Sequence, residues 1–147
     1  MLVEKINAEP RVEKPARTFS VLVVEDCESD VVLVQNMLSE YCPDIYLNIS
    51  DVPRLADAFK LIDREDFDVV LLDLNLLDIQ GVASVAALHA EIPNTLIIVY
   101  SGMNDPKLHR ESLQCGAQYY CVKGNETGYS LKHVIEEVLA ANAEKIA

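Results

Sequence analysis

Short, mostly apolar runs recur along this chain, and each ends at a polar residue. Four of them, Phe19–Val24, Val69–Leu72, Thr95–Tyr100 and Tyr119–Val122, are apolar at nearly every position. Runs of this length are typical of strands that are buried on both faces of a sheet. A fifth run, Ile45–Ser50, alternates between apolar and polar residues, which favours a half-exposed strand at a sheet edge.

The segments between these runs have apolar residues at helical spacing. We expect five helices, over about residues 29–41, 53–64, 82–91, 106–115 and from 127 to about 139. Ser29, Asp105 and Thr127 are suitable N-caps, and Asp105 is followed by a proline at the first helical position. Gly116 suits the C-terminal cap of the fourth helix.

Strands that alternate with helices across short turns predict a parallel sheet with helices on both faces, an α/β fold. The alternating second strand suits an edge, which favours the flavodoxin-like strand order 2-1-3-4-5. Residues 1–17 contain Pro10 and Pro15 and show no periodicity, so we expect a loosely ordered extension. A single domain is then expected over residues 18–147, with no second domain after it.

Composition narrows the range of partners. The formal net charge is −12, and residues 19–147 alone carry eight basic and 21 acidic residues, a net −13. Such a surface repels nucleic acid and anionic membranes, so basic proteins or cations are the expected partners. No apolar run approaches the roughly 18 residues that span a bilayer, and the N-terminus lacks a signal core, so we expect a soluble cytoplasmic protein.

The cysteines show neither a C-x-x-C pair nor metal-ligand spacing with histidine. We therefore expect buried or half-buried thiols in a reducing compartment. The four residues are Cys27, Cys42, Cys115 and Cys121.

Chemically useful side chains follow four of the five predicted strands. Glu25 and Asp26 follow the first, Asp73 the third, Ser101 the fourth and Lys123 the fifth. Taken one at a time, these residues have simpler explanations. Acids are favoured at a helix N-terminus, serine is common in turns, and a lysine at the end of a strand can simply be solvated. In the order 2-1-3-4-5, however, Asp26 and Asp73 face each other across one strand spacing, about 5 Å. Carboxylates this close repel, and a hard divalent cation such as Mg²⁺ relieves the repulsion.

Four ordered segments, VLVVED, LLDLNLLDIQG, IIVYSG and GAQYYCVKG, resemble the motifs of response-regulator receiver domains of two-component signalling, the CheY-like family. The resemblance covers Phe19 to about Leu139. It implies that Asp73 is the phosphoacceptor and that Lys123 pairs with the phosphoryl oxygens. It also implies that Glu25, Asp26 and Asp73, with the backbone carbonyl of Asn75, bind Mg²⁺ or Mn²⁺.

The same resemblance implies a conformational switch and its partners. Ser101 matches the switch hydroxyl, and Tyr120 matches the aromatic residue that turns inward on phosphorylation. The expected donor is a histidine kinase or a phosphotransfer protein, and the expected output surface is the last helix with the strand before it. No enzymatic activity is expected beyond the protein's own phosphorylation and dephosphorylation. An apolar excess on the first helix, at Val32, Leu33 and Met37, predicts a docking surface for the donor.

Four positions depart from the family pattern. Gly124 follows the lysine where the family often has a proline after a cis bond, which predicts a flexible turn. Glu25 replaces the commoner aspartate and is one methylene longer, so we expect it to reach a metal through water. Leu77 stands in place of a proline and Gly102 in place of an alanine. None of these changes removes a reactive group.

Other functions remain open at this point. The chain is expected to act as a stand-alone phosphorylated receiver, but a docking module that works without phosphorylation and a phosphorelay intermediate are alternatives. A homodimer is a further candidate assembly. An aspartate-nucleophile phosphatase is disfavoured because Asn75 stands where such enzymes have a second acid. A flavodoxin is disfavoured because its first loop must bind a phosphate, which the segment EDCESD repels.

Overall fold

The computed structural model describes residues 18–124 and 126–146, and the predicted N-terminal extension lies outside them. The described chain forms a five-stranded parallel sheet in the order β2-β1-β3-β4-β5, as predicted. The described elements, in chain order, are β1 (Thr18–Val24), α2 (Glu28–Tyr41), β2 (Tyr46–Val52), α3 (Leu55–Ile62), β3 (Val69–Leu72), α4 (Val82–Glu91), β4 (Leu96–Ser101), α5 (Pro106–Gln114), β5 (Tyr119–Val122) and α6 (Thr127–Ile146).

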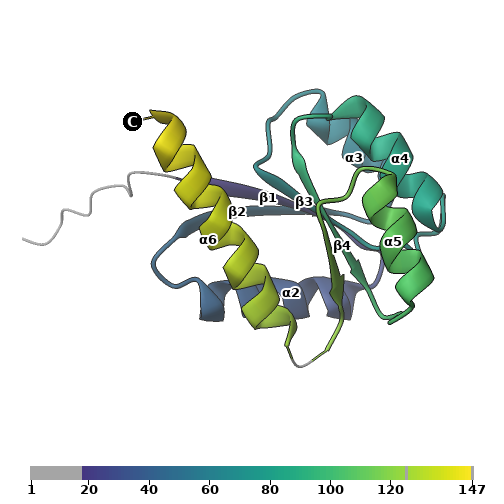
Figure 1. Cartoon of the computed structure of the whole chain (residues 1–147), viewed down its shortest axis with the longest axis horizontal. Coiled ribbons are helices and arrows are strands. Elements are labelled where there is room, and N and C mark those ends of the chain that lie inside the picture. The colour runs from purple at the N-terminus through teal and green to yellow at the C-terminus, as the bar shows by residue number, and fades with distance from the viewer. Residues whose placement is uncertain (1–17, 125, 147) are drawn as a thin grey trace, which may run out of the picture.

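Helices cover the sheet on both faces, with α2 and α6 on one face and α3, α4 and α5 on the other (Figure 1). The central strand β3 contributes to both apolar layers because successive side chains of a strand point to opposite faces. Val69 and Leu71 pack in the layer of α2 and α6, and Val70 and Leu72 pack in the other. All four are buried, as the uninterrupted apolar run predicts.

Strand β2 lies at an edge of the sheet and pairs on one side with β1. Tyr46 and Asn48 are exposed, whereas Leu47 and Ile49 are partly buried against the core. The alternating pattern therefore identifies a half-exposed edge strand correctly.

The predicted ends of α5 are confirmed. Asp105 is the N-cap, and its side chain accepts a hydrogen bond of 3.0 Å from the backbone N–H of Lys107. Gly116 follows the C-cap with a φ of 123°, a conformation that L side chains rarely adopt. A Cβ at Gly116 would also lie 2.4 Å from Cγ of His89 on the neighbouring helix α4. Glycine is therefore needed here both for the turn and for the approach of the two helices.

The other two predicted caps are wrong. Helix α2 begins at Glu28 with Cys27 as its N-cap, and Ser29 lies one residue inside the helix with its Oγ 3.2 Å from the Cys27 sulfur. Thr127 is the first residue of α6, and its hydroxyl bonds back to the preceding turn. Both residues lie one or two positions inside the helix, a shift that apolar periodicity does not resolve.

The cysteines are all free thiols, but their burial differs. Cys42 and Cys121 are buried and Cys115 is partly buried, as expected. Burial raises the pKa of the Cys42 and Cys121 thiols, which keeps both protonated. Cys27 is exposed, contrary to the prediction, because it lies at the open N-terminus of α2. Across the described residues, no helix is both long and apolar enough to span a membrane.

Candidate functional site

The parallel register brings the predicted site residues to one edge of the sheet. Val24 and Leu72 are partners in the β1–β3 pairing, so Glu25 and Asp73 follow neighbouring strand ends. The backbone N–H of Asp73 donates to the Val24 carbonyl at 3.1 Å. At the next pair of strand ends, the Lys123 N–H donates to the Ser101 carbonyl at 2.8 Å. These strand ends line a cavity of about 800 Å³.

Three carboxylates meet in this cavity. Glu25, Asp26 and Asp73 each place one carboxylate oxygen within 4.8 Å of the other two. Glu25 and Asp73 are only 3% and 5% exposed, so water cannot disperse their charge. Burial raises the pKa of the Glu25 carboxyl; the hydrogen bond from Lys123 acts against this shift, and the Asp73 carboxylate adds to it. The site therefore concentrates buried negative charge, which a positive group beside it stabilises.

Lys123 supplies a positive charge at this site. Its Nζ lies 2.8 Å from Oε1 of Glu25, 2.9 Å from Oδ2 of Asp30 and 3.7 Å from Oδ1 of Asp73. Its Nζ also lies 4.9 Å from the ring centre of Tyr100, which is a cation–π contact. Burial by itself would lower the pKa of Lys123, but the hydrogen bonds to Glu25 and Asp30 outweigh it and raise the pKa. The ammonium group therefore stays protonated beside Asp73.

The three carboxylates fit a hard divalent cation. All ligand atoms of this group are carboxylate oxygens. Mg²⁺ prefers one or two carboxylates and retains several waters, which the open cavity has room for. Asn75 lines the same cavity and pairs with Gln80 in an isolated β-bridge. The metal-ligand role of the Asn75 carbonyl stays a prediction.

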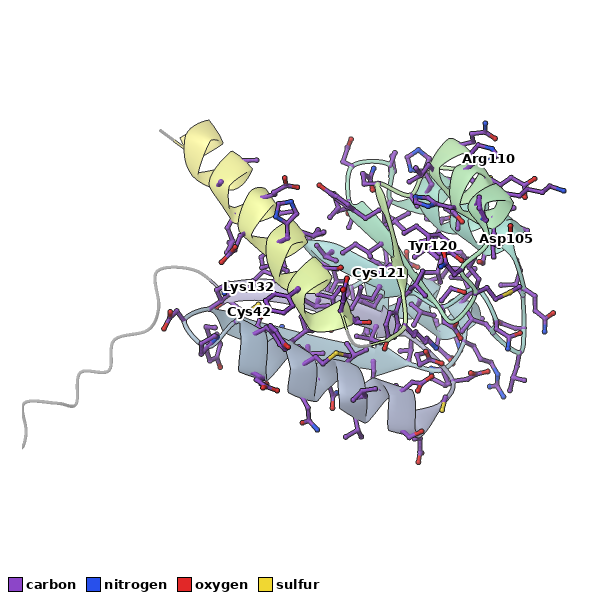
Figure 2. The ribbon with its side chains drawn as sticks, turned by 60° about the horizontal axis from the view of Figure 1, so that its bottom comes forward. Cys42, Asp105, Arg110, Tyr120, Cys121 and Lys132 are labelled. Carbon is purple, nitrogen blue, oxygen red and sulfur yellow. The ribbon has the colours of Figure 1, made fainter. Side chains whose placement is uncertain are left out.

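Ser101 lines the cavity, and Tyr120 contacts the loop after β4. Ser101 is buried, and its Oγ accepts a hydrogen bond of 3.1 Å from the N–H of Met103. The Tyr120 hydroxyl donates to the Met103 carbonyl at 2.7 Å, and its ring stacks on His109 of α5 with centres 5.0 Å apart. Figure 2 shows Tyr120 directed toward α5, whereas the next residue, Cys121, lies on the side of α6.

Three residues at this edge were missed by sequence reasoning. Asp30 contacts Lys123, Met103 joins Ser101 to Tyr120, and Asp78 accepts hydrogen bonds from the N–H groups of Leu55 and Ala56. Met103 acts through backbone atoms, which leave no trace in the sequence. Asp30 was detectable in principle, because a helix that starts at Glu28 places it in the first turn after the Glu25-Asp26 pair.

The departures from the family motifs leave the cavity intact. No described peptide bond is cis, so the bond from Lys123 to Gly124 is trans, and the flexibility predicted for this turn stays a prediction. A Cβ at Gly102 would meet nothing within 4 Å. Leu77 is 75% exposed. Of the residues predicted to form the docking surface on α2, Val32 and Leu33 are about half exposed, whereas Met37 is partly buried and packs against the core.

Comparison with known proteins identifies relatives over most of the chain. The family model of the response regulator receiver domain matches residues 21–135. The transcriptional regulatory protein ZraR of Salmonella typhimurium is 26% identical over 126 residues, which are 86% of this chain and 27% of that protein. The chemotaxis protein CheY of Listeria monocytogenes is 21% identical over 105 residues, 71% of this chain and 86% of that protein. The chain thus spans about a quarter of the length of the ZraR-type relatives.

Solved structures share the fold. A CheY-like receiver domain protein from Methanospirillum hungatei superposes with a TM-score of 0.71 at 20% identity, covering 87% of this chain and 99% of that one. The receiver domain of the sensor histidine kinase PA1611 from Pseudomonas aeruginosa superposes with a TM-score of 0.70 at 18% identity, covering 84% and 99%. That structure has a magnesium ion coordinated in its active site cleft.

Proposed function

Because this chain belongs to the response regulator receiver domain family of two-component signalling, we propose that it accepts a phosphoryl group on Asp73. The donor in this proposal is a phosphohistidine on a histidine kinase or a phosphotransfer protein. The observation that supports it best is the convergence of Lys123 and three carboxylates at a single sheet edge. The protein then acts through phosphorylation-dependent protein contacts rather than through turnover of a separate substrate.

The proposed transfer is a displacement at phosphorus. A carboxylate oxygen of Asp73 forms a bond to phosphorus while the phosphorus–nitrogen bond of the donor breaks, and the donor imidazole keeps the electron pair. Glu25, Asp26 and Asp73 hold Mg²⁺ or Mn²⁺ in this proposal, and the bound cation offsets the charge of the phosphoryl oxygens. Lys123 donates hydrogen bonds to the same oxygens from its place 3.7 Å from Asp73. The residues thus contribute positioning and charge balance.

Phosphorylation by a small donor tests this function. With Mg²⁺ and acetyl phosphate or phosphoramidate, intact-mass spectrometry should show a gain of one phosphoryl group. The gain should vanish in Asp73→Asn and persist in Asp51→Asn, which removes the same charge from an exposed position on β2. An absent gain in the parent protein would favour the alternative, a receiver-like docking module that works unphosphorylated. Transfer of the phosphoryl group onward to a second histidine protein would identify a phosphorelay intermediate.

The exposed side chains of Val32 and Leu33 are the proposed donor-docking surface. They are 53% and 51% exposed on α2, whose first turn lies beside the acid cluster. Val32→Asp should slow phosphotransfer from the cognate kinase while leaving phosphorylation by acetyl phosphate unchanged. Equal rates from the kinase in the variant and the parent would place the docking surface elsewhere. The output surface is proposed on α6 and β5, with the target protein or a second copy of the chain as its occupant.

A cytoplasmic location completes the proposal. Its support is the set of four free cysteines, since a reducing compartment keeps thiols free.

A further inference from the structure

Asp30 occupies an unexpected place next to the proposed phosphoryl site. It lies in the first turn of α2, one-third exposed, and its Oδ2 is 2.9 Å from the Lys123 ammonium. None of the motifs that indicate the proposed function includes this position. The contact joins residues 93 positions apart in the sequence, so it depends on the tertiary fold rather than on local structure.

The capping pattern of α2 explains why the Asp30 carboxylate is free to reach the lysine. In a capping box, a glutamate or glutamine at the third helical position reaches back and accepts the N–H of the N-cap residue. In this chain the N–H of the N-cap, Cys27, instead donates to Oε2 of Glu25 at 3.2 Å. Glu25 rather than Asp30 thus accepts this N–H, and Asp30 accepts a hydrogen bond from Lys123. Its position is not accounted for by the helix terminus alone.

The geometry of the ammonium group sets up a competition. Lys123 has three N–H donors, and Glu25 and Asp30 accept hydrogen bonds at 2.8 and 2.9 Å. Asp73 lies beyond hydrogen-bond distance at 3.7 Å. A phosphoryl group on Asp73 needs donors from the same ammonium, and it also meets the negative charge of Asp30. Both effects oppose the phosphorylated state.

We propose that Asp30 is a positioning residue that restrains Lys123 and so limits how tightly the site holds a phosphoryl group. This inference rests on the proposed function. Removing the Asp30 charge while keeping the shape of the side chain should release Lys123 toward Asp73. The expected gain in affinity for a phosphoryl mimic is about two- to fivefold, which is the range for one partly exposed ion pair.

Beryllofluoride titration in saturating Mg²⁺, followed by ¹⁹F NMR, provides the test. Asp30→Asn is compared with Glu28→Gln, which removes the same charge from the same helical turn without a described contact to Lys123. A second readout does not depend on the mimic: acylation of Lys123 in the metal-free protein by an N-hydroxysuccinimide ester, quantified by peptide mass spectrometry. Thermal unfolding establishes that both variants are folded.

The outcomes separate the alternatives. Tighter beryllofluoride binding and faster Lys123 acylation in Asp30→Asn, with neither change in Glu28→Gln, support the restraint. Equally tighter beryllofluoride binding in both variants would attribute the effect to net charge and overturn the proposed restraint. Weaker or unchanged binding in Asp30→Asn would overturn it as well, and weaker binding would mean that Asp30 orients the lysine productively. A parent protein that binds no beryllofluoride would contradict the proposed function. A parent protein that binds it, together with an Asp30→Asn variant that binds it no more tightly, would contradict only the restraint by Asp30.

Discussion

Ser101 and Tyr120 are joined through the backbone of one residue. Met103 donates its N–H to Ser101 Oγ at 3.1 Å and accepts the Tyr120 hydroxyl at its carbonyl at 2.7 Å. If Asp73 is phosphorylated as proposed, a shift of the Ser101 hydroxyl toward the phosphoryl group would break the first bond and release the loop that holds the second. The two residues that resemble a switch are therefore mechanically connected in this chain.

This connection predicts a signal at His109, whose ring stacks on Tyr120. Beryllofluoride with Mg²⁺ should move the Tyr120 ring off His109, and the loss of its ring current should shift the His109 proton resonances. With only three histidines in the chain, the resonances are readily assigned by ¹H NMR. The shift should be strongly reduced in Ser101→Ala. A full shift in that variant would show that the ring moves independently of the hydroxyl.

The crowding of carboxylates predicts that the site lowers the stability of the folded protein when no cation is bound. Glu25 is buried within 4.8 Å of two other acids, and its pKa is raised, so its ionised form is disfavoured by folding. Since the folded pKa lies above the unfolded value, the stability due to Glu25 is present at low pH and is lost as the pH rises through the folded pKa. At pH 7 without a divalent cation, Glu25→Gln should therefore raise the urea midpoint.

The same variant should lose part of its response to Mg²⁺. A cation that binds only the folded protein stabilises it, by about 2.7 kcal/mol at a concentration of 100 Kd. The shift in urea midpoint on adding Mg²⁺ should be smaller in Glu25→Gln than in the parent, and Glu28→Gln should respond like the parent. A lower midpoint for Glu25→Gln in the absence of a cation would mean that the pair with Lys123 outweighs the burial of the carboxylate.

The fold and the main site residues could be predicted because their signals are local and repeated. The apolar run at Val69–Leu72 indicates a strand buried on both faces, and the polar residue that ends each strand marks the shared sheet edge. Contacts that cross the fold left no such signal. The turn residue Asp78 is an example: its two carboxylate oxygens accept the N–H groups of Leu55 and Ala56 at 3.2 and 3.1 Å, so it caps α3 from 23 residues away.

Removal of this long-range cap should destabilise the protein in a pH-dependent way. The slight burial of Asp78 acts to raise its pKa, but the hydrogen bonds from the N–H groups of Ala56 and Leu55 outweigh this effect and lower the pKa. The stability from the cap is therefore complete above the unfolded pKa of about 3.9 and is lost as the pH falls through the lower folded value. Asp78→Ala should cost about 0.5–2 kcal/mol at pH 7, the usual range for a cap.

Urea unfolding at pH 7 and pH 3 measures this effect. The difference between Asp78→Ala and the parent should shrink at pH 3, below the unfolded pKa, where proton binding favours the unfolded chain. Asp66→Ala, at another exposed acidic position, should stay close to the parent at both values. A difference of equal size at both pH values would mean that the carboxylate charge contributes nothing to the cap.

Thr127 offers a test of how the turn after Lys123 is held. Its buried hydroxyl accepts the N–H of Gly124 at 2.9 Å and donates to the carbonyl of Val122 at 3.1 Å, so it closes the turn on both sides of the lysine. Thr127→Val keeps the shape but removes both bonds, which should cost about 1–3 kcal/mol in urea unfolding because two backbone groups lose their partner. Thr127→Ser keeps the hydroxyl and should retain most of the stability. An unchanged stability of Thr127→Val would show that the hydroxyl contributes nothing, and would leave the turn to the backbone bond from Thr127 N–H to the Gly124 carbonyl.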